Sequence, residues 1–432
     1  MRFARLQSDR EGAPLGIEDL ASSARLDYLQ LDYPRPRWAS VAGAAPAELP
    51  EYAIGFGEAL RAIVKPLYLD PQLHVIASAG WADAFSCVER AAAILVEAGC
   101  GEMPLAAVRG SNLQPILEML EGDGINLDNA ETGARWRELK APVLAADLQL
   151  GAGPLALALA EQARVIVAGA FDGTAPLVAA GAHRFGWKWD QHDLLAAAAA
   201  ASRAASWIDW EAFGAAGAGD LAWRPNRIEI NEAGEILVES TLADGAVATR
   251  LEKWLRETES LTNADRHADV CERCSTLQCG VAGPGQLAIG GAQGAASDDC
   301  WELEVLYEAG FAVEALIEFS EQSDRRWRQH LATVARTSLH GDRDGDGLLT
   351  VEELQGVSGG GGWLHLAFQA KSRGNCQRFA EQVVKLAAAH RPHVRLSSDR
   401  PAVHVHCGRW PVRVPRDAVD IAVETRMARE WV

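Results

Sequence analysis

The chain lacks a basic excess and a long apolar run. Its 432 residues carry 41 lysines and arginines against 59 aspartates and glutamates, a formal net charge of −18. This charge would repel a polyanion, so we expect neither nucleic acid nor an anionic membrane surface as a partner. No run of about eighteen apolar residues could form a membrane-spanning helix, and Met1 leads into polar residues rather than an apolar signal core. We therefore expect a cytoplasmic protein.

Cysteine is also scarce. Eight cysteines in a chain of this length indicate a reduced compartment rather than a disulfide framework. One group has metal-like spacing: His267, Cys271, Cys274 and Cys279. A closed zinc site needs four ligands, and the fourth is ambiguous here. His404 and His406 share one face of a strand, but simple alternation gives the same pattern. We interpret both groups as metal-free and expect no stoichiometric zinc in the purified protein.

One acidic segment has the spacing of an EF-hand-type calcium loop. The predicted Ca²⁺ ligands are Asp342, Asp344, Asp346, the carbonyl of Leu348, Thr350 and Glu353. Gly347 would supply the sharp turn, and Leu349 would point inward. A helix leaving this loop would soon meet the glycines at 359–362, and no second loop follows to pair with it. We therefore predict a structural or modest-affinity site rather than a sensor; the alternative is a solvated acidic loop.

The first half of the chain alternates short apolar strands with helices, which is typical of a parallel α/β sheet. The predicted strands are residues 26–33, 73–77, 105–108 and 165–168. The predicted helices are residues 83–98, residues 112–120 and an alanine-rich surface helix at residues 196–205. Ser111 and Gln114 would form a capping box at the start of the second helix.

The second half changes to hairpins. We predict one hairpin over residues 227–239 and another over 301–319, followed by a strand at 363–368 and a helix at 375–389. The expected fold is α/β: a parallel-sheet domain with helices on both faces over residues 1–215, then an α+β domain over 216–432. The calcium loop, at about residues 342–353, would be an insertion into the second domain.

Ligands of parallel sheets bind beyond the carboxyl ends of the strands. This rule brings four loops around one crevice: residues 32–33, 78–81, 110–112 and 169–173. Asp32 and Asp172 could act there as a base or bind a hydroxyl group, and His183 could join them, although it could equally be a satisfied, partly buried residue. Convergence of these three with Ser78 and Asn112 in one pocket would favour catalysis.

The order of several segments resembles the acyclic terpene utilisation (AtuA-like) family. They are Leu26-Asp27-Tyr28-Leu29, Gly151-Ala152, the stretch from His183 to Asp190, Ser338-Leu339-His340-Gly341 and Val414-Pro415-Arg416. The chain also departs from the family, with Gly110-Ser111-Asn112 in place of Gly-Asp-Asp and Ala170 in place of an arginine. Because an arginine there would have clamped a carboxylate or phosphate, we expect a neutral or weakly charged ligand.

Two functions from different classes stay open. The first is a calcium-binding, AtuA-like accessory or small-molecule-binding module whose strand-end loops have lost the ancestral activity. The second, implied by the resemblance, is an enzyme that acts on an acyl or other small organic substrate in terpenoid-type catabolism. The expected cofactor is Ca²⁺. The expected partners are a small organic ligand and further copies of the chain in a homo-oligomer. We expect no nucleic acid and no membrane as a partner.

Overall fold

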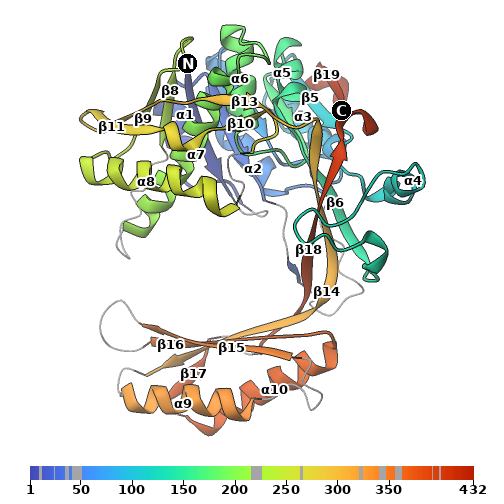
Figure 1. Ribbon diagram of the computed structural model, residues 1–432, viewed down its shortest axis with the longest axis vertical. Helices are drawn as coiled ribbons and strands as arrows, with labels where there is room; N and C mark the ends of the chain where they lie inside the picture. Colours follow the sequence, from blue (N-terminus) through green and yellow to red (C-terminus); the bar gives the residue numbers. More distant parts are fainter. Residues whose placement is uncertain are drawn as a thin grey trace.

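Two sheets organise the part of the chain that the structure describes (Figure 1). The computed structural model describes all residues except 9–11, 24, 35–37, 41–50, 216–225, 263–265, 321–324, 340–346, 356–361, 392 and 398–399. A ten-stranded sheet with most of the helices forms the upper body in Figure 1, and part of a seven-stranded sheet forms the lower layer. No helix among the described residues is long and apolar enough to cross a membrane.

Five parallel strands form the centre of the ten-stranded sheet. In spatial order they are β1 (Arg2–Gln7), β2 (Tyr28–Asp32), β4 (His74–Ala77), β7 (Val165–Val167) and β5 (Pro104–Arg109). The four strands predicted from the sequence are confirmed, whereas β1 was missed. The apolar pattern of β1 is interrupted by Arg5, which forms an ion pair with Asp32 at the end of β2.

Helices pack against both faces of this parallel region. They are α1 (Ile17–Ser23), α2 (Gly55–Leu69), α3 (Ala84–Glu97), α5 (Ala152–Ala160), α6 (Ala175–Phe185) and α7 (His192–Ala215). The short α4 (Leu117–Gly122) lies to the side (Figure 1), next to the 3-10 turn at Gln114–Ile116, which contacts β6. Successive strand residues enter different cores, since Val75 packs with α2 and α3 while Ile76 packs with α5 and α6. The helix predicted at 83–98 is confirmed as α3, where the Asp83 carboxylate accepts a hydrogen bond of 3.0 Å from the Ser86 amide.

Two local predictions in this half are wrong. The predicted capping box is absent, because neither the 3-10 turn at Gln114–Ile116 nor α4 after it has a side-chain cap; Asn112 Oδ1 accepts from the Gln114 amide at 3.1 Å, and Ser111 is buried with 3% of its surface exposed. The alanine-rich segment is not a surface helix, because Ala196 and residues 198–201 have no exposed surface. Their small side chains let α7 pack closely against α6, β9 and β10.

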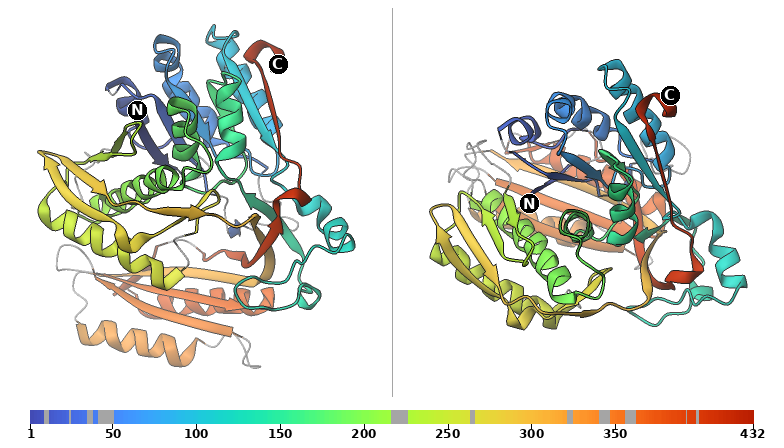
Figure 2. Two further views of the ribbon diagram at one scale, coloured as in Figure 1. Left: turned by 45° about the horizontal axis from the view of Figure 1, so that its top comes forward. Right: turned by 90° about the horizontal axis from the view of Figure 1, so that it is seen from above.

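The ten-stranded sheet continues into the second half of the chain. The predicted first hairpin is confirmed as β8 (Arg227–Ile230) and β9 (Ile236–Glu239). The same sheet includes β11 (Gln278–Gly283), β12 (Gln286–Gly290) and β19 (Ala422–Met427). Near them lie α8 (Gly245–Thr262) and the small pair β10 (Val270–Glu272) and β13 (Gly294–Ala296). Figure 2 shows the C-terminal end, with α11 (Ala428–Trp431), back beside the upper body, where α11 contacts α3.

A single strand of 20 residues, β14 (Cys300–Phe319), replaces the second predicted hairpin, which is therefore wrong. The residues read as a turn form a β-bulge, because the register against β18 (Val403–Pro415) shifts between Glu308 and Gly310. Gly310 has a φ of 138°, and a Cβ there would lie 2.6 Å from the carbonyl oxygen of Ala370. Gly310 is therefore part of a bulge in which two backbone segments approach closely, and not of a chain reversal.

The seven-stranded sheet is built on β14. Its order is β15 (Gly347–Gln355), β16 (Gly362–Ala370), β14, β18 and β3 (Trp38–Ser40), with β17 (Val394–Leu396) and β6 (Val143–Gln149) also paired to β14. Helices α9 (Arg325–Ser338) and α10 (Arg373–Ala389) pack on its lower part around Val313, Phe368 and Phe379. The predicted strand at 363–368 and helix at 375–389 are confirmed. The ten-stranded and the seven-stranded sheet each contain strands from both sides of residue 215.

The second half of the predicted calcium loop is a strand. Residues 347–355 pair with β16 along their whole length, so the expectation of a helix leaving the loop is wrong. Leu349 packs against the core of the lower layer, as predicted, whereas Thr350 and Glu353 are exposed. Asp342, Asp344 and Asp346 lie outside the described residues.

Candidate ligand-binding site

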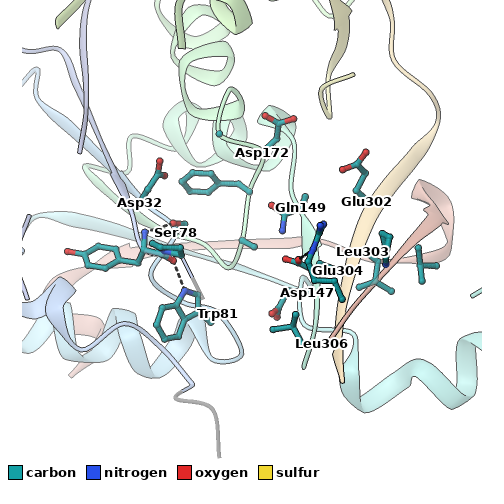
Figure 3. A pocket seen from close by; sticks show the side chains of 18 of the residues that line it. Asp32, Ser78, Trp81, Asp147, Gln149, Asp172, Glu302, Leu303, Glu304 and Leu306 are labelled. Atoms are coloured by element: carbon teal, nitrogen blue, oxygen red, sulfur yellow. Dashed lines mark hydrogen bonds and ion pairs between the residues drawn. The ribbon is translucent and has the colours of Figure 1, made fainter. Parts of the chain in front are cut away.

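A pocket with a volume of about 850 Å³, here called the strand-end pocket, lies at the carboxyl ends of the parallel strands. One wall consists of the ends of these strands and the loops after them, with Asp32 at the end of β2, Ser78 following β4 and Asp172 following β7. The facing wall is antiparallel, and its residues come from β6, β14 and β18. Figure 3 shows Asp32, Ser78 and Trp81 across the pocket from Glu302, Glu304 and Leu306.

The loop wall is held by hydrogen bonds among its own residues. The Tyr33 amide donates to the Ser78 hydroxyl at 2.9 Å, and the Trp81 indole donates to the Tyr33 carbonyl at 2.8 Å. Ser78 is buried and tied to this loop, so its hydroxyl has a structural role. Gly169 packs against Ser111 and the Trp81 carbonyl so closely that a Cβ would overlap the Ser111 hydroxyl. Glycine is required there for close packing of two loops.

Both aspartates of the loop wall already accept several hydrogen bonds. Asp32 forms an ion pair with Arg5, and the Gln30 side-chain amide donates to its two oxygens at 2.9 and 3.1 Å. Asp172 accepts through Oδ1 from the amide and hydroxyl of Thr174, each at 2.8 Å, and through Oδ2 from the Ala268 amide at 2.9 Å. These carboxylates therefore fix the shape and charge of the pocket.

A buried ionic network lies behind Asp172. His267 has Nδ1 3.7 Å from Asp172 Oδ2 and Nε2 3.2 Å from Glu272 Oε2, and Arg203 donates to Glu272 at 2.8 Å. Burial disfavours the imidazolium, but the two carboxylates outweigh it and raise the pKa of His267 to about 9. The pKa of Asp172 is lowered, since the hydrogen bond to His267 and the backbone donors outweigh its burial. His267 is thus a fixed cation at neutral pH.

A second buried carboxyl group supports the same region. Asp269 accepts from the Ala152 amide at 2.8 Å, which satisfies a free N–H group at the start of α5. Gly151 precedes this helix because a Cβ there would collide with the Asp269 carboxylate. Burial raises the pKa of Asp269 to about 6, and the negative charge of Asp172 adds to this effect.

The antiparallel wall supplies further acidic side chains. Glu302 and Glu304 lie on β14, and Asp147 and Gln149 lie on β6 (Figure 3). The pKa of Glu302 is raised, first by burial of its carboxyl group and then by repulsion from Asp172. A carboxyl group with a raised pKa that borders a pocket can exchange a proton with a bound ligand.

The charges of the pocket are nearly balanced. Six carboxylates line it, together with four arginines. Each arginine is in an ion pair: Arg5 with Asp32, Arg266 and Arg413 with Asp298, and Arg409 with Glu304. A polyanion would therefore meet neutralised arginines and a small excess of negative charge.

The structure brings together only part of the predicted site. Asp32, Ser78 and Asp172 line one pocket, whereas Asn112 and His183 are outside its lining. The Nδ1 atom of His183 lies 2.6 Å from the Tyr28 hydroxyl at the start of β2, and the His183 ring packs edge-on against His74 at the start of β4. His183 is therefore at the amino ends of these strands, away from the pocket.

Several lining residues had no usable signal in the sequence. Arg5, Glu302, Glu304 and Arg409 enter the pocket only because β1, β14 and β18 pair with strands far away in the chain. Asp147 was detectable in principle, since residues 143–149 form an apolar run that ends in polar residues, as the other predicted strands do.

The suspected metal groups have other contacts. Cys274 is buried and receives a contact of 3.0 Å from Arg203 Nη1, and His404 and His406 alternate along β18 with the buried Val405 and Cys407. All eight cysteines are free of disulfides. Within the described ranges, no group of three or more His, Cys, Asp or Glu residues is arranged to hold a metal ion. The absence of zinc stays a prediction.

Comparison with known proteins gives one match. Residues 9–204 match the model of the acyclic terpene utilisation family protein AtuA. This segment is similar to that family. The resemblance inferred from the sequence is thereby confirmed for the AtuA-like segment. No curated protein and no solved structure matches the chain.

The AtuA-like segment contributes most of the loop wall and the β6 residues of the antiparallel wall. Asp32, Ser78, Asp147 and Asp172 fall within it, whereas Glu302 and the other lining residues of β14 and β18 lie beyond it. The pocket is therefore completed by residues outside the matched segment.

The His267 network makes a testable prediction about pH. Because the folded-state pKa of about 9 exceeds the ordinary value of 6.5, the charged imidazole stabilises the fold fully below pH 6.5. This contribution is lost as the pH rises through about 9, by up to roughly 3 kcal/mol. Urea unfolding at a series of pH values should show this decline. His267→Gln should remove it, and His330→Gln, at an exposed position of α9, should retain it. A wild-type curve that is flat between these pH values would contradict a charged His267.

Proposed function

We propose that this protein is an AtuA-like binding or accessory protein that holds an uncharged or singly charged organic molecule in the strand-end pocket. The observation that carries this proposal is the pairing of every lining arginine with a carboxylate. Paired guanidinium groups leave little to attract a phosphate-rich ligand, whereas the carboxylates of Asp147 and Glu302 can accept hydrogen bonds from hydroxyl groups.

The size and lining of the pocket support a ligand of this kind. Its volume of about 850 Å³ lies in the range typical of small-molecule sites, roughly 300–1,000 Å³. Phe171, Leu303 and Leu306 offer apolar surface for a hydrocarbon body, and Gln7 and Gln149 offer amides for polar substituents. The match of residues 9–204 to a terpene utilisation family is consistent with such a ligand.

The alternative function is that of an enzyme for an acyl or other small organic substrate in terpenoid-type catabolism. One observation favours it: Glu302 has a raised pKa and faces a pocket that also contains Asp172. Glu302 would exchange a proton with the substrate. Repulsion from the Asp172 carboxylate would help to keep the pKa of Glu302 raised. Glu302→Gln separates the two functions, since it should abolish turnover in an enzyme and leave binding largely intact in a binding protein.

Ligand binding can be tested with matched pocket variants. Calorimetry should show binding of an acyclic terpene alcohol or octanediol and no measurable binding of ATP or coenzyme A at micromolar concentration. Ala170→Phe, which fills the pocket beside Asp172, should abolish the binding. Ala160→Phe places the same side chain at the exposed end of α5 and should leave it unchanged. Tight binding of either nucleotide that is lost in Ala170→Phe would show that the pocket is an anion site.

We also propose that the acidic segment between α9 and β15 binds Ca²⁺. The segment joins a helix that ends at Ser338 to a strand that begins at Gly347, and Leu349 packs inward as the loop pattern requires. Thr350 and Glu353 are three residues apart on β15 and so point to opposite faces. Glu353 would reach an ion in the loop only after the end of β15 leaves the sheet.

The calcium proposal makes a specific prediction. Titration calorimetry should show uptake of one Ca²⁺ at millimolar ion, and Asp344→Asn should weaken it by about tenfold through loss of one charged ligand. Glu352→Gln, at a position outside the predicted ligand set, is the matched control. Glu353→Gln should also weaken binding if the ion draws the end of β15 from the sheet. An absence of calcium uptake by the wild-type protein would contradict the proposal.

A further inference from the structure

A second hollow opens beside the strand-end pocket and is lined mainly by cations. This side hollow has a volume of about 330 Å³ and shares Arg5, Asp172 and Arg266 with the larger pocket. Its other polar groups include Arg203, His267 and the hydroxyl of Ser206. The larger pocket has an excess of carboxylates, whereas Asp172 is the one carboxylate among the described residues that line the side hollow.

The carboxylate of Asp172 is already bonded to the protein. It accepts from Thr174 and Ala268, and it lies against the charged ring of His267. The other carboxylates that balance the four cations are Asp32, Glu272 and Asp298, and none of them lines the side hollow. Three of the four balancing carboxylates therefore lie outside the side hollow, whose lining carries four cations and one carboxylate.

Two of the cations can donate to a ligand. Arg203 and His267 are buried and paired with Glu272, and they contribute charge; the Nη2 atom of Arg203 is buried and has no hydrogen-bond partner among the described residues. Arg5 donates through Nε to Asp32 and through Nη1 to Ser206. Its Nη2 has no hydrogen-bond partner among the described residues and lies beside Gly173, where an added Cβ would be 3.5 Å away. The Arg266 side chain is 46% exposed and bonds Asp298 through Nη1, so it is free to turn inward.

We propose that the side hollow binds the single carboxylate group of a ligand whose body occupies the strand-end pocket. The proposal rests on the binding function proposed above and narrows it to a monocarboxylic acid with hydroxyl groups. Arg5 and Arg266 would each donate a hydrogen bond to the carboxylate group. Binding involves no covalent step. A second anionic group on the ligand would lie in the larger pocket, where the carboxylate excess would oppose it.

The experiment compares two probes by calorimetry on the full chain, hydroxyoctanoate and hydroxyoctanamide. They share one hydroxylated hydrocarbon chain and differ only in the carboxylate or amide group at its end. The wild-type protein should prefer the acid by about tenfold or more, because hydrogen bonds to a charged group are stronger than those to an amide. Arg266→Gln should remove most of this preference while the amide still binds. Asp298→Asn is the matched control: it breaks the same ion pair but lines neither the strand-end pocket nor the side hollow, and it should keep the preference.

The outcomes separate this proposal from the binding function. Equal affinities for acid and amide, both abolished by Ala170→Phe, would leave the strand-end pocket as a binding site and overturn the carboxylate site. An equal loss of preference in Arg266→Gln and Asp298→Asn would also overturn it, since the effect would then come from the broken ion pair and not from the Arg266 donor. Tighter binding of octyl phosphate than of hydroxyoctanoate would overturn the choice of carboxylate over phosphate. Binding of neither probe would contradict both proposals.

Discussion

The pairing of β14 with strands from distant parts of the chain is the constraint on which the remaining structure depends. The first half of β14 pairs with β6 and β18, and its second half pairs with β16 and β17. The bulge at Gly310 lets one strand serve both regions, because it shifts the register without ending the strand. In this way β14 carries Glu302 and Glu304 to the carboxyl ends of the parallel strands and closes the pocket.

Charge compensation determines what this pocket can hold. The buried chain of contacts from Asp172 through His267 and Glu272 to Arg203 alternates carboxylates with cations. The larger pocket therefore keeps a slight negative excess, while the side hollow beside Asp172 presents mainly positive groups. This difference is the basis of the proposed ligand, which has a neutral body and one acidic group; a second anionic group would meet the carboxylate excess of the larger pocket.

The parts of the fold that follow local rules were predictable. Strand ends place Asp32 and Asp172 together because parallel strands share one carboxyl edge. Gly310 was misread because turns and bulges use the same residue, and only the approach of the Ala370 carbonyl distinguishes them. The burial of α7 was predictable in principle, since a helix with no polar face packs on all sides. Glu302 was not predictable, because its position depends on long-range pairing that leaves no local pattern.

A crystal structure of the protein with hydroxyoctanoate bound would test the central claim most directly, namely that the two walls form one site. The account predicts ligand density in the strand-end pocket between Asp172 and Glu302, with the carboxylate within hydrogen-bonding distance of Arg5 or Arg266. Density that touches only the loops after the parallel strands, or that lies in the separate groove beside β9 and β12, would contradict it.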